Sequence, residues 1–506
     1  MGLNITRILR PVFMKRVCLT ERFKDYADEI QASELSGLLG DAAQTEVGRK
    51  YRFGEISSYE DFKNRVPVHC YEDLKPQILR TLAGEKDILW PGRVRNFAQS
   101  SGTSDGRSKY IPITADSFSK CHYQGGFDTV AHYLNMNPDS RMFSGRSFIL
   151  GGSFANQVKD CPKGTKIGDL SANLIQNINP FANLVRVPSK EIALMEDWTK
   201  KLPALVEASM NKDITNISGV PSWFMSVIKE VLKRKGVSCI HDVWPNLEVF
   251  FHGGISFAPY KAQYESFCDM SKMHFVETYN ASEGFFAVQN TADTKAMLLL
   301  LDVGVFYEFR SVDDPSAQPI PVWEIEQGKT YELIITANNG LWRYAIGDTV
   351  YIESLNPVKI RIAGRTKHFI NAFGEELMVH NADAAISATC AKTGVHILNY
   401  TAAPVYSTAS SKGRHQWLIE FDGQISDEKI EDFAKMLDSE LRKVNSDYDA
   451  KRTGDLFIDS LSITKARHNL FDDWLIERTG RLGGQKKVPR LSNDRTVIES
   501  MLKLNK

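Results

Sequence analysis

The sequence predicts a two-domain α/β protein: a large N-terminal α/β domain that contains a β subdomain, followed by a smaller α+β domain. At 506 residues and 42% hydrophobic content, the chain is too long for one small core. Strand and helix signals alternate from residue 146 to residue 284, which is typical of a layered α/β domain. A β-rich stretch over 296–363 is then followed by a new pattern of helices and strands. We therefore predict domains at 1–364 and 365–506.

The composition narrows the class of protein. Lys plus Arg equals Asp plus Glu at 62 each, so no overall charge attracts nucleic acid or an anionic membrane. The seven cysteines are odd in number and lack a C-x-x-C pair, which favours a reducing compartment. There is no apolar run of about 18 residues and no signal peptide. We expect a cytoplasmic protein with no nucleic-acid partner and no stable membrane association; its oligomeric state is unknown, and a monomer is compatible with these features.

Residues 1–85 are expected to be helical. Apolar residues recur at helical spacing in the first helix, beside several basic residues. The apolar positions are Ile5, Ile8, Leu9, Val12 and Phe13, and the basic ones are Arg7, Arg10, Lys15 and Arg16. We expect this helix to pack on the core with a basic face outward, and a membrane-surface helix is the alternative that the same spacing allows. The start of the chain, 1–6, also fits the loose myristoylation pattern, which is too short to enter the functional prediction.

Further along the chain, strands and helices are predicted from periodicity and from turn residues. Strands are expected at 88–90, 96–98, 110–113, 146–150, 247–251, 296–301, 305–309, 331–335, 358–362, 395–398 and 416–421. Helices are expected at 116–135, 190–210, 221–236 and 427–445. Pro221 suits the first turn of its helix. In such a layered domain, ligand-binding loops lie at the carboxyl ends of the strands.

A loop crowded with hydroxyls and glycines predicts a phosphate site. It comprises Ser100, Ser101, Gly102, Thr103, Ser104 and, after Gly106, Lys109. Glycine lets the backbone approach a ligand, while hydroxyls and N–H groups donate to phosphate oxygens. The loop matches neither G-x-x-x-x-G-K-[ST] nor G-x-G-x-x-G, so a different nucleotide chemistry is indicated. An ordinary Ser/Gly-rich surface loop is the alternative.

Two further segments carry candidate nucleotide ligands. In Tyr279-Asn280-Ala281-Ser282-Glu283, the tyrosine offers a flat face for a base and the glutamate can hold Mg²⁺ through oxygen. A solvated surface carboxylate is the alternative for Glu283. In the segment 340–350, Asp348 follows a glycine and can accept both hydroxyls of a ribose, whereas Trp342 and Tyr344 are expected to be packing residues.

Taken together, these segments resemble the acyl-acid amido synthetases, the auxin-responsive family within the adenylate-forming superfamily of acyl-CoA synthetases and luciferases. The resemblance covers most of the chain. Its motifs are the phosphate loop 100–104, the adenine-bordering segment 244–246 with Gly253 and Gly254, the tyrosine motif 279–283, the ribose motif from 331 to 348, and Gln485-Lys486-Lys487-Val488-Pro489-Arg490. The resemblance implies the adenylate-forming architecture, with nucleotide contacts from Gly253, Gly254, Asn280, Ala281 and Ser282.

The departures from the family pattern concern its plant members. Asn280 and Ala281 replace part of the expected tyrosine motif, and His252 stands where plant sequences carry a small hydroxyl residue. Gly364-Arg365 is closer to the hinge of the wider superfamily, and Arg365 is counted with the nucleotide-binding residues. These differences favour a non-plant member with other substrates and leave the adenylation machinery intact.

The resemblance implies a two-step reaction that uses ATP and Mg²⁺. A carboxylic acid attacks the α-phosphorus of ATP to form an acyl adenylate, and a second nucleophile then displaces AMP. An amine, expected to be that of an amino acid, gives an amide, which is our first prediction. Coenzyme A would give a thioester, and a nucleotide- or acid-binding sensor without turnover is the non-enzymatic alternative.

The C-terminal domain is predicted to be a mobile lid that turns about Gly364-Arg365-Thr366. Its catalytic residue would be Lys487, brought to the α-phosphate during adenylation and then withdrawn, with Lys486 as the competing candidate. Two solvated surface lysines are the alternative.

The acid-binding pocket is predicted within 118–127, 148–153 and 217–225. Phe127, Phe148, Trp223 and Phe224 are its aromatic residues. Aromatic residues at helical spacing are more often core residues than substrate contacts, so a core role is the stronger alternative.

Overall fold

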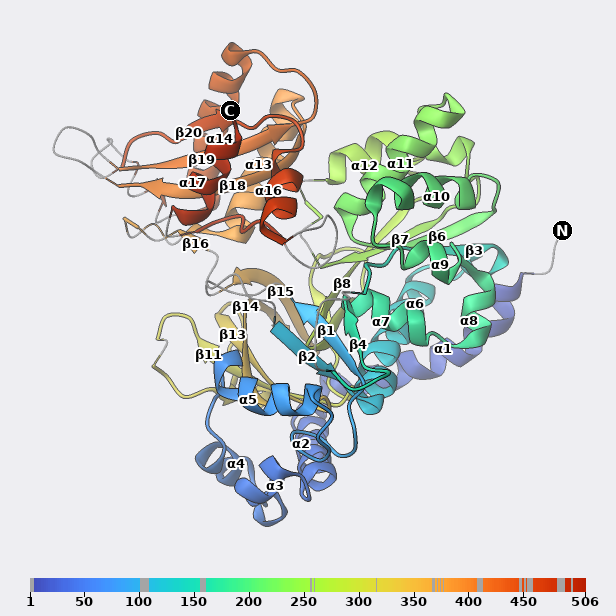
Figure 1. Ribbon diagram of the computed structural model, residues 1–506, viewed down its shortest axis with the longest axis vertical. Helices are drawn as coiled ribbons and strands as arrows, with labels where there is room; N and C mark the ends of the chain where they lie inside the picture. The colour runs from blue at the N-terminus through green and yellow to red at the C-terminus, as the bar shows by residue number, and fades with distance from the viewer. Residues whose placement is uncertain are drawn as a thin grey trace. The chain divides into compact units, whose positions relative to one another are not determined.

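The computed structural model (Figure 1) describes residues 4–506 except 101–108, 155–160, 255–256, 259, 315, 366–368, 371, 374, 376, 407–412, 446–447, 450–451, 453–457, 480–486 and 493–494. The chain divides into two compact units. The first comprises Met1–Ile255, Phe267–Ile362 and Gly483–Gln485, and the second Ser256–Ser266, Ala363–Leu482 and Lys486–Lys506. The second unit thus includes a short segment from the middle of the chain. The boundary at residue 364 that the sequence suggests stays a prediction.

Helices dominate the start of the first unit, as the sequence predicts for residues 1–85. They are α1 (Ile5–Glu21), α2 (Ala27–Ala42), α3 (Glu46–Lys50), α4 (Tyr59–Arg65) and α5 (Tyr71–Leu82). The later helices of this unit are the π-helical turn Ser117–His122, α6 (Tyr123–Met136), α7 (Leu170–Asn177), α8 (Pro180–Val185), α9 (Lys190–Ala193), α10 (Trp198–Ser209) and α11 (Pro221–Lys235). Pro221 occupies the first turn of α11, as expected.

Among the described residues, twelve strands form one large sheet in the order β12-β11-β13-β14-β15-β10-β9-β8-β7-β6-β3-β5. These are β3 (Arg146–Ile149), β5 (Arg186–Val187), β6 (Ile214–Gly219), β7 (Val249–Gly253), β8 (His274–Ala281), β9 (Gly284–Gln289), β10 (Met297–Leu299), β11 (Val305–Ser311), β12 (Ile320–Pro321), β13 (Thr330–Ala337), β14 (Leu341–Leu355) and β15 (Val358–Arg365). A smaller sheet joins β2 (Lys109–Ile113), β1 (Asn96–Ser100) and β4 (Lys166–Gly168).

The large sheet changes character along its length. Strands β5, β3, β6, β7 and β8 are parallel, whereas β9 pairs antiparallel with β8, and β11, β12, β13 and β14 pair antiparallel as well. Helices cover both faces of the parallel half, because neighbouring residues of a strand point to opposite faces. Phe250 packs on Phe224 of α11 at 5.3 Å, while Phe251 packs on Tyr133 of α6 at 5.5 Å. The predicted α/β domain with a β subdomain is confirmed.

The second unit is an α+β structure. It contains α12 (Lys261–Phe267), β16 (Phe369–Ile370), β17 (Leu377–Met378), α13 (Val379–Thr393), β18 (Ile397–Val405), β19 (Arg414–Phe421), α14 (Asp427–Val444), β20 (Ser462–Lys465), α16 (Leu470–Thr479) and α17 (Thr496–Leu504). Its sheet has the order β18-β19-β20, and α13 and α14 pack on it through a buried cluster that includes Ile386, Trp417 and Phe433. The predicted helix 427–445 is confirmed by α14.

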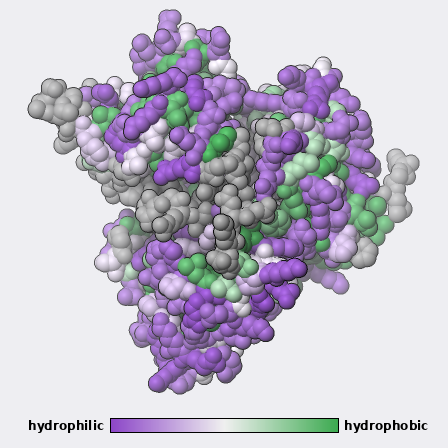
Figure 2. All heavy atoms as spheres, viewed as in Figure 1, coloured by the Kyte–Doolittle hydropathy of each residue, from purple (hydrophilic) through white to green (hydrophobic). Residues whose placement is uncertain are grey.

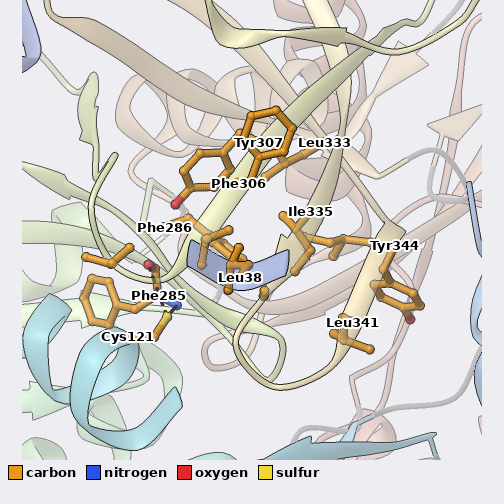
Figure 3. Close-up of a cluster of buried hydrophobic side chains, with 14 of the residues drawn as sticks. Leu38, Cys121, Phe285, Phe286, Phe306, Tyr307, Leu333, Ile335, Leu341 and Tyr344 are labelled. Carbon is orange, nitrogen blue, oxygen red and sulfur yellow. Dashed lines mark hydrogen bonds between the residues drawn. The ribbon is translucent and has the colours of Figure 1, made fainter. Parts of the chain in front are cut away.

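The core of the first unit gathers around the antiparallel half of the sheet. Figure 3 shows part of it, with Leu38, Phe286, Phe306 and Leu333 directed toward one another from α2 and from three strands. The buried amide of Gln31 on α2 also binds β11, because its Nε2 donates to the Val305 carbonyl oxygen at 2.9 Å and its Oε1 accepts from the Tyr307 N–H at 2.8 Å. This packing holds β13 and β14, and therefore the segment 340–348, in a fixed frame.

Two local predictions are wrong. Ile88, Leu89 and Trp90 are buried but form no strand, and left-handed turns at Asp87 (φ 55°) and Gly92 (φ 80°) bound this apolar run. The predicted helix 190–210 is interrupted between α9 and α10. In both places the spacing of hydrophobic residues is real, but turns in the backbone interrupt the predicted strand or helix.

The orientation of α1 also differs from the prediction. Phe13 packs on Phe127 at 4.5 Å, but the four other apolar residues of the stripe, Ile5, Ile8, Leu9 and Val12, are exposed. The buried positions of the helix are Thr6, Arg16, Val17 and Thr20. Arg16 is held inside because it pairs with Asp128 at 2.7 Å and Asp302 at 2.6 Å, and these ion pairs set the rotation of the helix. None of the described helices has both the length and the apolar character needed to cross a bilayer.

Candidate functional site

The candidate site lies where the parallel strands of the large sheet end. Strands β6, β7 and β8 are parallel neighbours, so their carboxyl ends meet at one edge of the sheet. Strand β7 ends in His252-Gly253, and β8 ends in Asn280-Ala281. Two of the predicted motifs therefore reach the same edge.

Glycine is required at the end of β7. A Cβ on Gly253 would lie 2.5 Å from the carbonyl oxygen of Thr278, so only glycine lets β7 and β8 pair at this point. Gly254 follows with φ +78°, a conformation that L side chains rarely adopt. The two glycines bring backbone rather than side chains to this edge, which suits close approach of a flat ligand.

Tyr279 and Asp348 link the second and third motifs. The Tyr279 hydroxyl donates to Asp348 Oδ2 at 2.6 Å, and each residue is 4% exposed. The Tyr279 ring packs edge-on against Phe286 at 4.9 Å, so the ring is fixed from the core side. A tyrosine of β8 and an aspartate of β14 are thus in direct contact although 69 residues separate them.

A distortion of β14 brings Asp348 to this position. The pairing with β13 passes from Ile334 opposite Ala345 to Glu332 opposite Thr349, so β14 contains two extra residues there. Gly347 lies in this bulge with φ +85°. Bulges redirect side chains and are common next to active sites. The glycine of the Gly-Asp pair therefore forms the bulge, and the bulge directs the carboxylate of Asp348.

Ser282 and Glu283 form the turn between β8 and β9. Both are buried, with Glu283 only 7% exposed, so the alternative of a solvated surface carboxylate is wrong. The turn is tied to the β13–β14 hairpin, because Asn339 Nδ2 donates to the Glu283 carbonyl oxygen at 2.9 Å. A buried carboxylate beside the Tyr279–Asp348 pair is chemically suited to a hard cation.

The hydroxyl-rich loop starts and ends beside β14. Ser100 pairs with Lys109 across the β1–β2 hairpin, and residues 101–108 lie outside the described part of the chain. Lys109 Nζ donates to the Tyr344 hydroxyl at 3.3 Å and lies over the Tyr71 ring at 5.4 Å. Gly102, Thr103 and Ser104 are thus not placed, whereas the two ends of their loop are held close to β14, the strand of Asp348.

Trp342 and Tyr344 are packing residues, as predicted. Both are fully buried, and Trp342 packs on Phe53 at 4.4 Å. Between them, the sequence did not single out Arg343, which pairs with Glu308 at 2.7 Å inside the core and has φ 42°. This ion pair stabilises the start of β14 and has no contact that suggests chemistry.

Two buried histidines border the strand ends. Burial lowers the pKa of His252 to about 3 and that of His122 to about 4, so both are neutral near pH 7. The nearby Asn280 side chain partly opposes the effect of burial on the pKa of His122. No motif or periodicity in the sequence identifies His122, which falls only within the predicted range 118–127.

A buried lysine fixes the loop after β3. Lys201 of α10 is 2% exposed, and its Nζ donates to the Gly151 carbonyl oxygen at 2.7 Å. Burial lowers its pKa to about 8, while the nearby Asp169 opposes this shift. Asp169 in turn accepts from the Ser153 backbone N–H at 2.8 Å. The loop 151–153, part of the predicted acid pocket, is therefore held by Lys201 and Asp169, which belong to no motif identified in the sequence.

The aromatic residues proposed for the acid pocket are mostly core residues. Phe148 and Phe224 are fully buried and contact each other at 5.2 Å. Phe127 stacks on α1 through Phe13. Trp223 is half-buried. Phe148 and Phe224 are therefore core residues, which was the alternative to a role in acid binding. The position of the acid pocket stays a prediction.

In the second unit, the C-terminal motif is anchored by Arg490. Its guanidinium pairs with Asp383 at 3.1 Å and lies over the Tyr400 ring at 4.7 Å, and these partners raise the pKa of Arg490. The backbone of the segment also pairs with β18, because the Ala402 N–H donates to the Arg490 carbonyl oxygen at 2.8 Å. Lys487 is exposed and lies three residues before this anchor.

Three residues predicted around the hinge and the C-terminal motif are not described in full. Lys486 and Thr366 lie outside the described residues, and of Arg365 only the backbone, at the end of β15, is described. Across the described residues, no group of three or more His, Cys, Asp and Glu side chains could hold a metal ion. Mg²⁺ that is bound mainly through substrate phosphates needs only one or two protein carboxylates, and Glu283 is the predicted one.

Comparison with known proteins covers nearly the whole chain. Three family models match it: the GH3 family N-terminal domain over residues 19–273, the central domain over 298–365 and the C-terminal domain over 380–496. Among curated proteins, the indole-3-acetic acid-amido synthetase GH3.3 of Arabidopsis thaliana is 21% identical and covers 96% of this chain and 93% of its own.

Two solved structures extend the comparison to the fold. AtGH3.15 acyl acid amido synthetase in complex with 2,4-DB superposes with a TM-score of 0.78 at 18% identity, covering 100% of this chain and 97% of the other. The 2-hydroxyisobutyryl-CoA ligase in its postadenylation state, with 2-HIB-AMP, superposes with a TM-score of 0.61 at 13% identity, covering 94% and 91%. The fold is therefore that of adenylate-forming enzymes.

Proposed function

Because this chain belongs to the GH3 family, we propose that it is an ATP-dependent ligase that joins a carboxylic acid to the amine of an amino acid. The observation that carries the proposal is the convergence of separate motifs at one edge of the sheet. Gly253, Tyr279, Glu283 and Asp348 come from β7, from β8 and the turn after it, and from β14, and the Tyr279–Asp348 hydrogen bond joins two of them.

The reaction has two steps. In the first, a carboxylate oxygen of the acid attacks the α-phosphorus of ATP, the bond to the β-phosphate oxygen breaks, and pyrophosphate leaves. In the second, the amine nitrogen attacks the acyl carbon, the bond to the phosphate oxygen breaks, AMP leaves, and the amine loses a proton. A site that excludes water protects the adenylate between the steps.

Each motif then has a role in nucleotide binding. Asp348 accepts both ribose hydroxyls, and Tyr279, held by Asp348 and Phe286, borders the base. The backbone at Gly253 and Gly254 and the segment 280–282 form the remaining border. Ser100–Ser104 and Lys109 hold the phosphates, where hydroxyl and N–H donors and a positive charge stabilise the developing negative charge.

Mg²⁺ and the C-terminal motif complete the proposal. Glu283 is the residue that would hold Mg²⁺, and the ion would neutralise phosphate charge. Lys487 supplies a second positive charge at the α-phosphate during adenylation, and Arg365 contributes to the nucleotide site. The relatives' names support an amino acid as the acceptor, since the curated relatives are amido synthetases.

Acid-dependent exchange of labelled pyrophosphate into ATP tests the first step. We expect exchange with at least one member of a panel of aryl and aliphatic acids, and none without acid. An absence of exchange with every acid, together with measurable ATP binding by calorimetry, would support a non-catalytic sensor instead.

Mass spectrometry of products tests the second step. The protein is incubated with an accepted acid, MgATP, a mixture of amino acids and coenzyme A together. We expect an amide with at least one amino acid. A coenzyme A thioester as the sole product would overturn the amide proposal and identify a ligase of the thioester-forming kind.

A further inference from the structure

The first helix leaves most of its apolar residues exposed, although several of its polar residues are buried. Ile5, Ile8, Leu9, Val12 and Leu19 are 44%, 60%, 39%, 56% and 51% exposed. They fall on one face at the spacing i, i+3, i+4 and i+7, continued at i+14. Thr6, Arg16, Val17 and Thr20 are the buried residues of α1. Such an inversion is unusual, because exposed hydrophobic groups normally occur singly.

Internal contacts hold α1 in this rotation. Arg16 makes buried ion pairs with Asp128 on α6 and with Asp302, while Thr6 Oγ1 accepts from the Phe143 backbone N–H at 2.9 Å. Phe13 stacks on Phe127. The helix is therefore anchored by its polar face at both ends, and it cannot turn its apolar stripe inward without breaking buried ion pairs, which is costly.

The charges beside the stripe are positive. Residues 1–20 contain four basic residues and no Asp or Glu. Arg7 and Lys15 are exposed, and Arg10 is half-buried with its Nε donating to the Leu134 carbonyl oxygen. Figure 2 shows hydrophobic residues on the right-hand side of the molecule, where Figure 1 places the start of α1. An apolar stripe on a segment whose charged residues, over 1–20, are all basic is complementary to an anionic lipid surface.

We propose that α1 is an interfacial helix through which the protein binds reversibly to the surface of anionic membranes. Ile5, Ile8, Leu9 and Val12 enter the boundary between headgroups and acyl chains, and Arg7 and Lys15 contact the anionic headgroups. This inference is independent of the proposed function.

Vesicle sedimentation tests the proposal with the full-length, unacylated protein carrying its tag at the C-terminus. The vesicles are phosphatidylcholine alone and a mixture of phosphatidylcholine and phosphatidylserine. We expect binding to the mixed vesicles, little binding to the neutral ones, and loss of binding at high salt, because the Debye length falls from about 10 Å at 0.1 M to about 3 Å at 1 M.

Substitutions separate the apolar from the basic contribution. Ile8→Glu with Val12→Glu should abolish binding, and Arg7→Glu with Lys15→Glu should weaken it by about tenfold or more. Leu79→Glu with Met270→Glu is the matched control, since both residues are 44% exposed on the same unit and the charge change is equal. The control should bind like the wild type. Thermal unfolding of each variant checks that the fold is kept.

Three results would overturn the proposal. One is no binding of the wild type to mixed vesicles at low salt, and another is unchanged binding of the Ile8→Glu, Val12→Glu variant. The third is a stable wild-type dimer in analytical ultracentrifugation that this variant converts to a monomer, because the stripe would then be covered by a second copy of the chain.

Discussion

At the scale of single residues, the Tyr279–Asp348 hydrogen bond makes each side chain dependent on the other. Asp348 has a donor in place before any ligand arrives, so its carboxylate is held in one orientation. Preorganised acceptors lose less entropy on binding, which is how a single aspartate can be effective for a ribose.

Asp348→Ala should chiefly weaken ATP binding. Removing a charged acceptor from a hydroxyl costs about 1.5–3 kcal/mol, or roughly 10- to 150-fold in affinity. Calorimetry with ATP measures this directly. Wild-type affinity in Asp348→Ala would remove the ribose assignment.

Tyr279→Phe probes the same contact from the other side. The ring and its packing on Phe286 remain, while the Asp348 carboxylate loses a donor. We expect a smaller loss of ATP affinity than in Asp348→Ala, and non-additive effects in the double variant, because the two residues share one interaction. Fully additive losses would show that Tyr279 acts on the nucleotide independently of Asp348.

Glu34 predicts a pH dependence of stability. Burial and the nearby Asp302 raise its pKa to about 7, although the Gly304 N–H donates to its carboxylate. A raised carboxyl pKa means that the folded state binds more protons than the unfolded one between pH 4.5 and 7. The contribution of Glu34 to stability is therefore complete below pH 4.5 and is lost as the pH rises through 7.

Thermal unfolding of the wild type and of Glu34→Gln at pH 5.5 and pH 8 measures this term. We expect Glu34→Gln to gain stability relative to the wild type as the pH rises. The buried histidines shift stability in the opposite direction, but they are common to both proteins and cancel in the difference. A constant difference between the two proteins across this range would contradict the raised pKa.

At the scale of elements, hydrophobic periodicity predicted most of the strands and helices that carry the site. The strands expected at 247–251 and 331–335 are β7 and β13, because each is an apolar run bounded by turn residues. Three other features depend on tertiary contacts that a single sequence does not display. These are the bulge at Gly347, the buried turn of Glu283, and the rotation of α1, which ion pairs across the fold determine.

The anchor of the C-terminal motif yields another prediction. Arg490→Met removes the positively charged partner of the buried Asp383, which keeps, among its described partners, only its hydrogen bond from the Tyr400 hydroxyl, and should lower the melting temperature, since uncompensated buried charge is costly. It should also slow adenylation, because the position of Lys487 depends on this segment. Lys435→Ala on α14, an exposed ion-pair residue, is the control and should change neither property. Adenylation at the wild-type rate in a folded Arg490→Met protein would separate Arg490 from catalysis.

At the scale of the whole molecule, the family and the fold could be predicted because motifs far apart in the sequence each matched one pattern. The lid motion and its hinge at Gly364-Arg365-Thr366 remain predictions, since they concern two arrangements of the same units. The acid and the amine also remain open, because no motif in the sequence specifies either of them.

Lys487→Ala tests the lid hypothesis. Loss of a positive charge at the transition state should slow pyrophosphate exchange by roughly 10²-fold or more, while amine attack on supplied acyl adenylate should survive. If Lys486→Ala shows the loss and Lys487→Ala does not, the catalytic lysine is Lys486. Normal exchange in both variants would remove the lysine from the mechanism.

The second compact unit contains a segment that is made long before the rest of it. Tyr260 and Gln263 hydrogen-bond to the carbonyl oxygens of Leu398 and Ile397, and Ser387 donates to that of Ala258. During synthesis the ribosome releases Ser256–Ser266 well before β18. The side chains of Tyr260 and Gln263 therefore lack these bonding partners until the β subdomain and β18 have been made. A fragment expressed from Ala363 onward would lack Tyr260 and Gln263 altogether. We therefore expect a fragment from Ala363 onward to be less stable than the same unit within the whole chain.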